Sequence, residues 1–199
     1  YASMNGRSPE EVINAVLAEL DRTNAWTRKA ILIVTTTGRG NVNEWSTSSF
    51  EFLMHGDCAT AAMQYSGLPS AVTMLSSKQI PVRASRMLFG AIEKRIAVLP
   101  VDARPKLFVA GESLGAFGSN GIFASPEDML SRAYGGVWTG CPSFTPNQVE
   151  WTRRRSTSST VVRPVVDHGR HVRFACSPSD LLFDEHGAAL DEWATPRFC

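Results

Sequence analysis

One serine in this chain stands in a setting that suits covalent chemistry. Residues 107–121 read LFVAGESLGAFGSNG, so Ser113 lies between Gly111 and Gly115 in a G-x-S-x-G pattern. In such an elbow a strand reverses sharply into a helix and leaves the serine hydroxyl at the edge of the sheet. Glycine is needed on both sides because the two backbones pass too close for a Cβ atom. We therefore predict that Ser113 is a nucleophile.

The G-x-S-x-G pattern also arises by chance in chains with this much glycine and serine. It indicates catalysis when a strand precedes it and a helix follows it. Here KLFVA, residues 106–110, is typical of a strand, and LGAFGSNGIF, residues 114–123, is typical of a helix. The backbone amide of Leu114, which opens that helix, is the first predicted donor to an oxyanion.

The second donor of such an oxyanion hole usually comes from the loop after an earlier strand. The run TTTGRGN, residues 35–41, follows the strong strand pattern AILIV. Thr37 and Gly38 are the predicted donors, with Thr36 as their neighbouring candidate. The same run also fits a plain turn without any catalytic role.

Strand and helix patterns alternate along most of the chain. The first helix pattern opens with a capping box, in which Ser8 and Glu11 cap each other's amides and Pro9 takes the first helical position. Helices are predicted within residues 7–23, 46–56, 82–100, 114–123 and 125–133, and strands within 30–35, 58–66, 106–113, 135–140 and 171–177. In the second helix Phe50, Leu53 and Met54 are expected to face inward. This alternation predicts an α/β fold, a mostly parallel sheet with helices on both faces, in a single domain over residues 1–199.

Composition and charge exclude several classes of protein. The chain has 199 residues, of which 43% are hydrophobic and 20% are charged, so a disordered or fibrous chain is not expected. A net charge of +1 argues against a nucleic-acid partner. The four cysteines form no CxxC pair, which argues against a structural metal site. No apolar run reaches the roughly 18 residues of a membrane span.

Five motifs together resemble a known family. They are, in order, IVTTTGRGNV, AAMQYSGLPS, RPKLFVAGESLGAFGS, GGVWTGCPSFTP and VRFACSPSDL. They resemble the α/β-hydrolases, and among these an actinobacterial group whose hydrolase domain follows a predicted membrane-spanning region. The resemblance implies a serine hydrolase that cleaves small or lipid-like acyl esters, needs no metal or organic cofactor, and associates with a membrane through a region outside this chain.

The resemblance also implies a Ser-His-acid triad, of which Ser113 is the nucleophile. In this superfamily the acid and then the histidine follow the serine, and we expect both beyond Cys199, so that the fold is incomplete at its C-terminal end. Inside the chain, His186 in a polar turn is the best substitute for the base, because His168 and His171 precede or enter a strand pattern. The acids available after Ser113 are Asp167, Asp180 and Asp184.

Three aromatic residues, Tyr65, Trp138 and Phe144, are candidates to line an apolar acyl pocket. The same three would also suit the hydrophobic core. The arginine run at residues 153–155 fits either an anion site or a solvated loop. Two other functions stay open, an acyltransferase that uses the same nucleophile and a catalytically silent binding or scaffold module.

Overall fold

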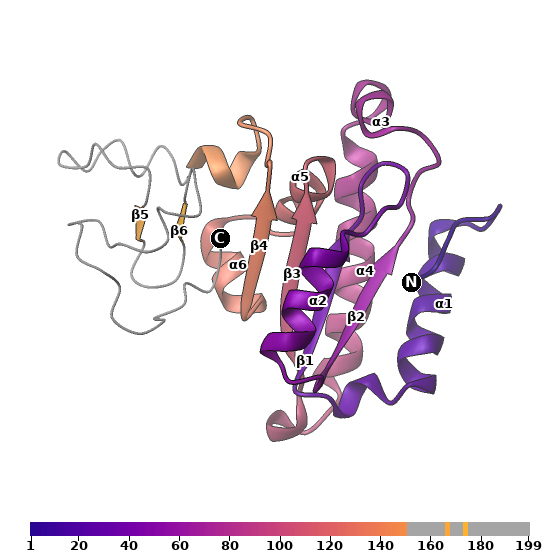
Figure 1. Ribbon diagram of the computed structural model, residues 1–199, viewed down its shortest axis with the longest axis vertical. Coiled ribbons are helices and arrows are strands. Elements are labelled where there is room, and N and C mark those ends of the chain that lie inside the picture. Colours follow the sequence, from indigo (N-terminus) through magenta and orange to yellow (C-terminus); the bar gives the residue numbers. More distant parts are fainter. Residues whose placement is uncertain (151–165, 168–172, 175–199) are drawn as a thin grey trace.

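The computed structural model describes residues 1–150, 166–167 and 173–174. Its main body is a four-stranded, all-parallel sheet in the order β2-β1-β3-β4 (Figure 1). The strands of this sheet are β1 (Ala30–Thr35), β2 (Cys58–Met63), β3 (Lys106–Glu112) and β4 (Gly135–Thr139). The helices are α1 (Pro9–Arg22), α2 (Glu44–Leu53), α3 (Ser70–Ser76), α4 (Gln79–Ala97), α5 (Leu114–Asn120) and α6 (Pro126–Arg132), with 3₁₀ turns η1 (Ala25–Thr27) and η2 (Val101–Ala103).

Local sequence explains how α1 begins. The amide of Glu11 donates to the Ser8 hydroxyl at 3.2 Å, and the Glu11 carboxylate accepts from the Ser8 amide at 2.7 Å. Pro9 occupies the first turn, where its missing N–H removes no helical hydrogen bond. The predicted capping box is confirmed, and Val12 and Val16 on one face of the helix are buried.

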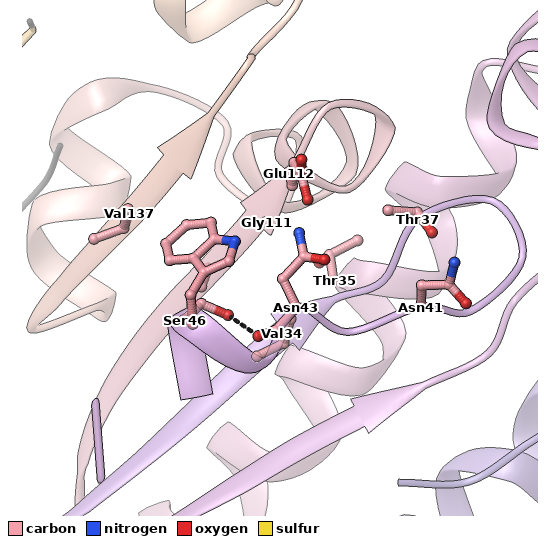
Figure 2. A pocket seen from close by; sticks show the side chains of 11 residues that line it. Val34, Thr35, Thr37, Asn41, Asn43, Ser46, Gly111, Glu112 and Val137 are labelled. Atoms are coloured by element: carbon pink, nitrogen blue, oxygen red, sulfur yellow. Dashed lines mark hydrogen bonds between the residues drawn. The ribbon is translucent and has the colours of Figure 1, made fainter. Parts of the chain in front are cut away.

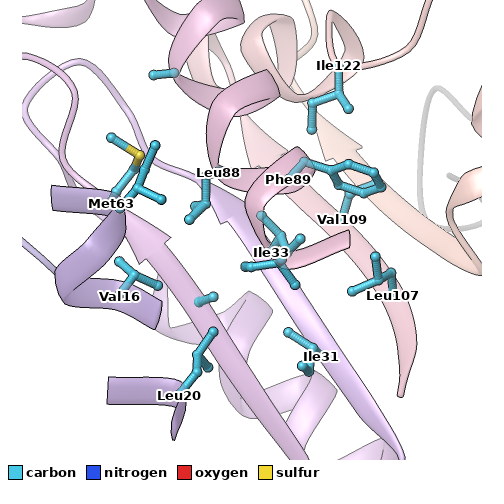
Figure 3. Close-up of a cluster of buried hydrophobic side chains, with 14 of the residues drawn as sticks. Val16, Leu20, Ile31, Ile33, Met63, Leu88, Phe89, Leu107, Val109 and Ile122 are labelled. Atoms are coloured by element: carbon cyan, nitrogen blue, oxygen red, sulfur yellow. The ribbon is translucent and has the colours of Figure 1, made fainter. Parts of the chain in front are cut away.

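The main core lies on the face of the sheet that α1, α4 and α6 cover. All six residues of β1 are buried, as expected for a central parallel strand. Side chains of alternate strand residues, such as Ile33 and Val109, meet Leu88 and Phe89 from α4 on this face (Figure 3). The helix predicted within residues 82–100 is therefore confirmed, although it begins earlier, at Gln79.

The other face of the sheet is covered by α2 through a smaller cluster. Phe50 packs edge-on against Phe108, with 5.2 Å between ring centroids. Helices thus lie on both faces of a parallel sheet, which confirms the predicted fold class. The expectation that Leu53 faces inward is wrong, because Leu53 is 69% exposed. The helix ends at Leu53 and turns through left-handed His55, so its last turn stays in solvent.

Two further elements differ from the sequence prediction. The short helix α3 was not predicted, since its sequence, SAVTMLS, shows no clear helical pattern. The strand expected within residues 171–177 is described only at β6 (Arg173–Phe174). This segment pairs antiparallel with β5 (Val166–Asp167) in a separate two-stranded sheet, so it does not extend the parallel sheet.

The core makes a direct prediction about stability. Phe89 is 0% exposed and packs against Phe123 with 5.5 Å between ring centroids, whereas Phe52 on α2 is 81% exposed. We expect Phe89→Ala to lower the free energy of unfolding by about 3–5 kcal/mol. The matched control Phe52→Ala should stay within about 0.5 kcal/mol of wild type. Urea titrations followed by circular dichroism measure both, and similar losses in the two variants would contradict this core.

Candidate active site

Ser113 sits in a strained turn between a strand and a helix. It follows β3 directly and precedes α5, with φ of 52° and ψ of −116°. Side-chain-bearing residues rarely adopt a positive φ, and such strain is often found at functional sites. The residues on either side in α5 and at the end of β3 are buried or half-buried, yet Ser113 itself is exposed. The turn therefore presents this residue to solvent at the carboxyl edge of the sheet.

Two glycines allow the turn to be this tight. A Cβ atom on Gly111 would lie 2.5 Å from the carbonyl carbon of Gly115. A Cβ on Gly115 would overlap the carbonyl oxygen of Thr35 in β1 and approach that of Thr36 to 2.9 Å. Real Cβ atoms do not approach backbone this closely, so α5 packs here as bare backbone against the ends of two strands.

Hydrogen bonds from the neighbouring strand hold the turn in place. The amide of Ser113 donates to the carbonyl of Thr139, the last residue of β4, at 2.9 Å. Farther along, the buried side-chain amide of Asn147 donates to the carbonyls of Asn120 and Phe123, at 3.1 Å and 3.2 Å. The last residue of β4 therefore holds the start of α5, and the chain after β4 holds its end.

The predicted oxyanion donors lie near this turn, but they differ in whether their amides already have a hydrogen-bond acceptor. The amide of Leu114 opens α5, and a helix's first amides have no acceptor within the helix. In contrast, the Thr37 amide donates to the Asn41 carbonyl at 3.1 Å, and the Gly38 amide donates to the Ser70 hydroxyl at 2.9 Å. Either of these two amides must exchange its present acceptor before it can bind a substrate oxygen.

Tyr65 stabilises the loop after β1 through a buried hydrogen bond. It is buried, and its hydroxyl donates to the Thr36 carbonyl at 2.9 Å, while the Thr36 hydroxyl donates to the Met63 carbonyl at 3.0 Å. Burial raises the pKa of the Tyr65 phenol above its ordinary value, so it stays protonated and able to donate. Tyr65 thus stabilises, from within the protein, the loop between β1 and α2, residues 36–43, which we call the β1 loop.

The other two candidate pocket residues lie apart from Tyr65. Trp138 in β4 is half-buried and packs against the main core. Phe144 is half exposed and packs against Phe117 of α5 at 5.7 Å between ring centroids, with the Lys78 ammonium 4.7 Å from the Phe144 centroid. None of the three predicted aromatics lines the hollow beside the elbow.

That hollow lies on the α2 side of the carboxyl edge, is partly open to solvent and has a volume of about 10 Å³, roughly the room that one water molecule needs. Its walls combine apolar strand ends with polar side chains, and Figure 2 shows Asn43 beside Ser46 at the start of α2, with Glu112 at the end of β3. Its lining residues are Val34, Thr35, Thr37, Asn41, Asn43, Trp45, Ser46, Ala110, Gly111, Glu112 and Val137. Sequence reasoning missed Asn43 and Trp45, although VNEW, residues 42–45, directly follows the loop already considered.

Among the described residues, no histidine lies beside Ser113. His55 is the only histidine among them, and it closes the C-terminal end of α2 in a left-handed conformation, just before β2 begins. It therefore lies toward the opposite edge of the sheet. The candidate base His186, together with His168, His171, Asp180, Asp184 and the arginines at 153–155, lies outside the described residues, whereas Asp167 is in β5.

A comparison with protein families shows to which family the chain belongs. The model of the alpha/beta-hydrolase family matches residues 1–199. The chain belongs to the alpha/beta-hydrolase family. A search of curated proteins found no match, and a search of solved structures found none either. In alpha/beta-hydrolases a G-x-S-x-G turn carries the nucleophile at the end of a central strand, which is the position of Ser113 after β3.

The described part of this alpha/beta-hydrolase contains neither a metal-binding cluster nor a membrane-spanning helix. No group of three or more His, Cys, Asp or Glu residues there is placed to hold a metal ion. In the same residues, no helix has both the length and the apolar character needed to cross a bilayer.

The glycine contacts predict opposite effects of one substitution at two helical positions. Gly115→Ala puts a Cβ into the Thr35 carbonyl and should lower the free energy of unfolding by at least about 1–3 kcal/mol. Gly90 lies inside α4, where an added Cβ meets nothing within 4 Å. Gly90→Ala should therefore raise stability by about 0.5–1 kcal/mol. Denaturant midpoints measure both changes in stability, and changes of the same sign in the two variants would contradict the close approach of α5.

The buried phenol predicts a pH dependence. Tyr65→Phe removes the hydrogen bond to the Thr36 carbonyl and should lower the free energy of unfolding by about 1 kcal/mol at neutral pH. The folded-state pKa of Tyr65 is raised above the unfolded value of about 10, so wild type loses this contribution as pH rises past about 10. The difference between wild type and variant should shrink over that range in urea titrations, and a constant difference would contradict the assignment.

Proposed function

We propose that this member of the alpha/beta-hydrolase family is a serine hydrolase that cleaves acyl esters, small or lipid-like, through an acyl-enzyme on Ser113. One observation carries the proposal. Ser113 is an exposed residue held at φ of 52° by backbone contacts at the carboxyl end of a central parallel strand. Ligands of open α/β sheets bind at that edge, so a bound ester can meet the hydroxyl there.

The proposed reaction has two halves. The Ser113 Oγ attacks the ester carbonyl carbon while a base takes its proton, and the resulting tetrahedral intermediate expels the alcohol, which receives that proton. Water then attacks the acyl-enzyme, with the base again taking a proton, and the carboxylic acid leaves as Ser113 is regenerated. A histidine and an acid that follow Ser113 in the chain would supply the base and its partner, in the order usual for this fold.

Backbone amides would stabilise the negative oxygen of the tetrahedral intermediate. The Leu114 amide is a suitable first donor because it opens α5 directly after the nucleophile. We assign the second donor to the Thr37 or Gly38 amide. Since both amides have acceptors in the present conformation, ester binding would have to break the hydrogen bond from Thr37 to Asn41 or the one from Gly38 to Ser70.

The hollow next to the elbow is shallow, so its walls offer surface contact to a small apolar part of an ester. Val34, Ala110 and Val137 supply apolar walls, and Trp45 adds an aromatic surface. Six of its eleven lining residues are polar, and side chains such as Asn43 and Ser46 could orient the ester by hydrogen bonds. Glu112 is the one charged side chain that lines it, which disfavours substrates with a carboxylate at that position.

A fluorophosphonate probe tests the nucleophile. In the full-length protein, made from its complete reading frame, we expect stoichiometric labelling at Ser113 and at least about a thousandfold loss of ester hydrolysis in Ser113→Ala. The matched control is Ser143→Ala, which changes another exposed serine in the loop after β4 and should label like wild type.

Three results would count against the proposal. Labelling that persists in Ser113→Ala would place the nucleophile elsewhere. No labelling of the well-folded full-length protein would favour a binding or scaffold role for the domain. Faster turnover with an added alcohol, giving a new ester as the main product, would assign acyl transfer in place of hydrolysis.

A further inference from the structure

The helix α3 exposes an unusual apolar surface. Leu75 is 88% exposed and Val72 is 46% exposed; they are three residues apart and so share one side of the helix. Leu68, just before the helix, is also exposed. We call these three residues the α3 surface. No residue of α3 is charged, so no long charged side chain of the helix interrupts this surface.

The inner side of α3 is firmly attached to the protein. Thr73 is buried, and its hydroxyl lies 3.1 Å from that of Ser66. Met74 packs against Leu114 and Phe117 of α5. Because the inner side is fixed in this way, Val72 and Leu75 cannot turn inward without breaking these contacts. Contiguous apolar groups held in solvent are typical of an interaction surface.

Exposed basic residues lie next to the α3 surface. Exposed Lys78 follows the helix, and exposed Arg39 is next to Gly38, whose amide binds the Ser70 hydroxyl at the first turn of α3. The sequence from residue 58 to residue 92 contains no aspartate or glutamate, and it includes exposed Arg83. Leucine and valine flanked by cations, without acids, complement an anionic bilayer surface.

The exposed apolar residues at the end of α2 provide a contrast. Phe52 and Leu53 are as exposed as the α3 surface, but Glu51 lies beside them in α2 and Asp57 follows closely. They also lie at the opposite end of the sheet from α3. Exposure alone therefore does not distinguish α3; its charge environment does.

From these observations we infer that the α3 surface docks on the surface of a bilayer that contains anionic lipid. Figure 1 shows α3 beyond the arrowheads of the strands, at the same end as the start of α5. Docking would therefore turn the edge that carries Ser113 toward the lipid. The consequence for substrate, an ester presented by the bilayer, rests on the proposed function, whereas the docking itself does not.

Vesicle sedimentation of the 199-residue chain tests the docking. We expect binding to vesicles of equal parts phosphatidylcholine and phosphatidylglycerol, and much weaker binding to phosphatidylcholine alone. Leu75→Glu should weaken binding at least about tenfold, because the leucine side chain no longer enters the interface. Lys78→Ala should weaken it about fivefold, in a salt-dependent manner.

Two controls keep the test specific. Phe52→Glu makes the same kind of change in the acid-flanked apolar residues of α2 and should bind vesicles like wild type. Ser113→Ala should also bind like wild type, so a failed nucleophile assignment leaves the docking result readable. Circular dichroism confirms that each variant is folded, as expected for changes at exposed positions.

The docking is overturned if wild type does not bind the anionic vesicles, or if Leu75→Glu binds as well as wild type. It is also overturned if sedimentation equilibrium shows a dimer that Leu75→Glu dissociates, because the α3 surface would then bind a second copy of the chain.

Discussion

The close approach of α5 to the ends of β1 and β3 is the constraint on which the site depends. Because Gly111 and Gly115 have no Cβ, a single residue, Ser113, separates the end of the strand from the start of the helix. The backbone of the helix lies against the carbonyl groups of Thr35 and Thr36. The connection is too short for an ordinary loop, so Ser113 must adopt a positive φ. The strain at Ser113 and the direction in which it points are thus two results of one packing contact.

Strand register brings the other parts of the site to the same place. Thr35 pairs with both Met63 and Gly111, and Glu112 pairs with Thr139, so the four strands end almost level. The loops that leave them are cross-linked by side chains, with Tyr65 of the β2 loop bound to the β1 loop. A parallel sheet without this level edge would hold Ser113 but separate it from the candidate oxyanion donors Thr37 and Gly38.

Local signals made much of the fold predictable. The Ser8 capping box, the apolar run of β1 and the elements on either side of Ser113 depend on neighbours in sequence, and all are present. What sequence could not supply depends on contacts between distant segments. Burial of Tyr65 under the β1 loop, exposure of Leu53 and the hollow formed by Asn43 and Trp45 all follow from how elements pack.

Asn147 anchors the segment after β4 to the end of α5. Its side-chain amide donates to the Asn120 and Phe123 carbonyls at the end of α5, the helix that follows Ser113, and so fixes the chain after β4 to this helix. For the proposed histidine, which would follow Asn147 in the chain, this fixed point shortens the free length of chain that separates it from Ser113 and so raises their effective concentration. This anchor would thus favour assembly of a triad from parts that are distant in sequence.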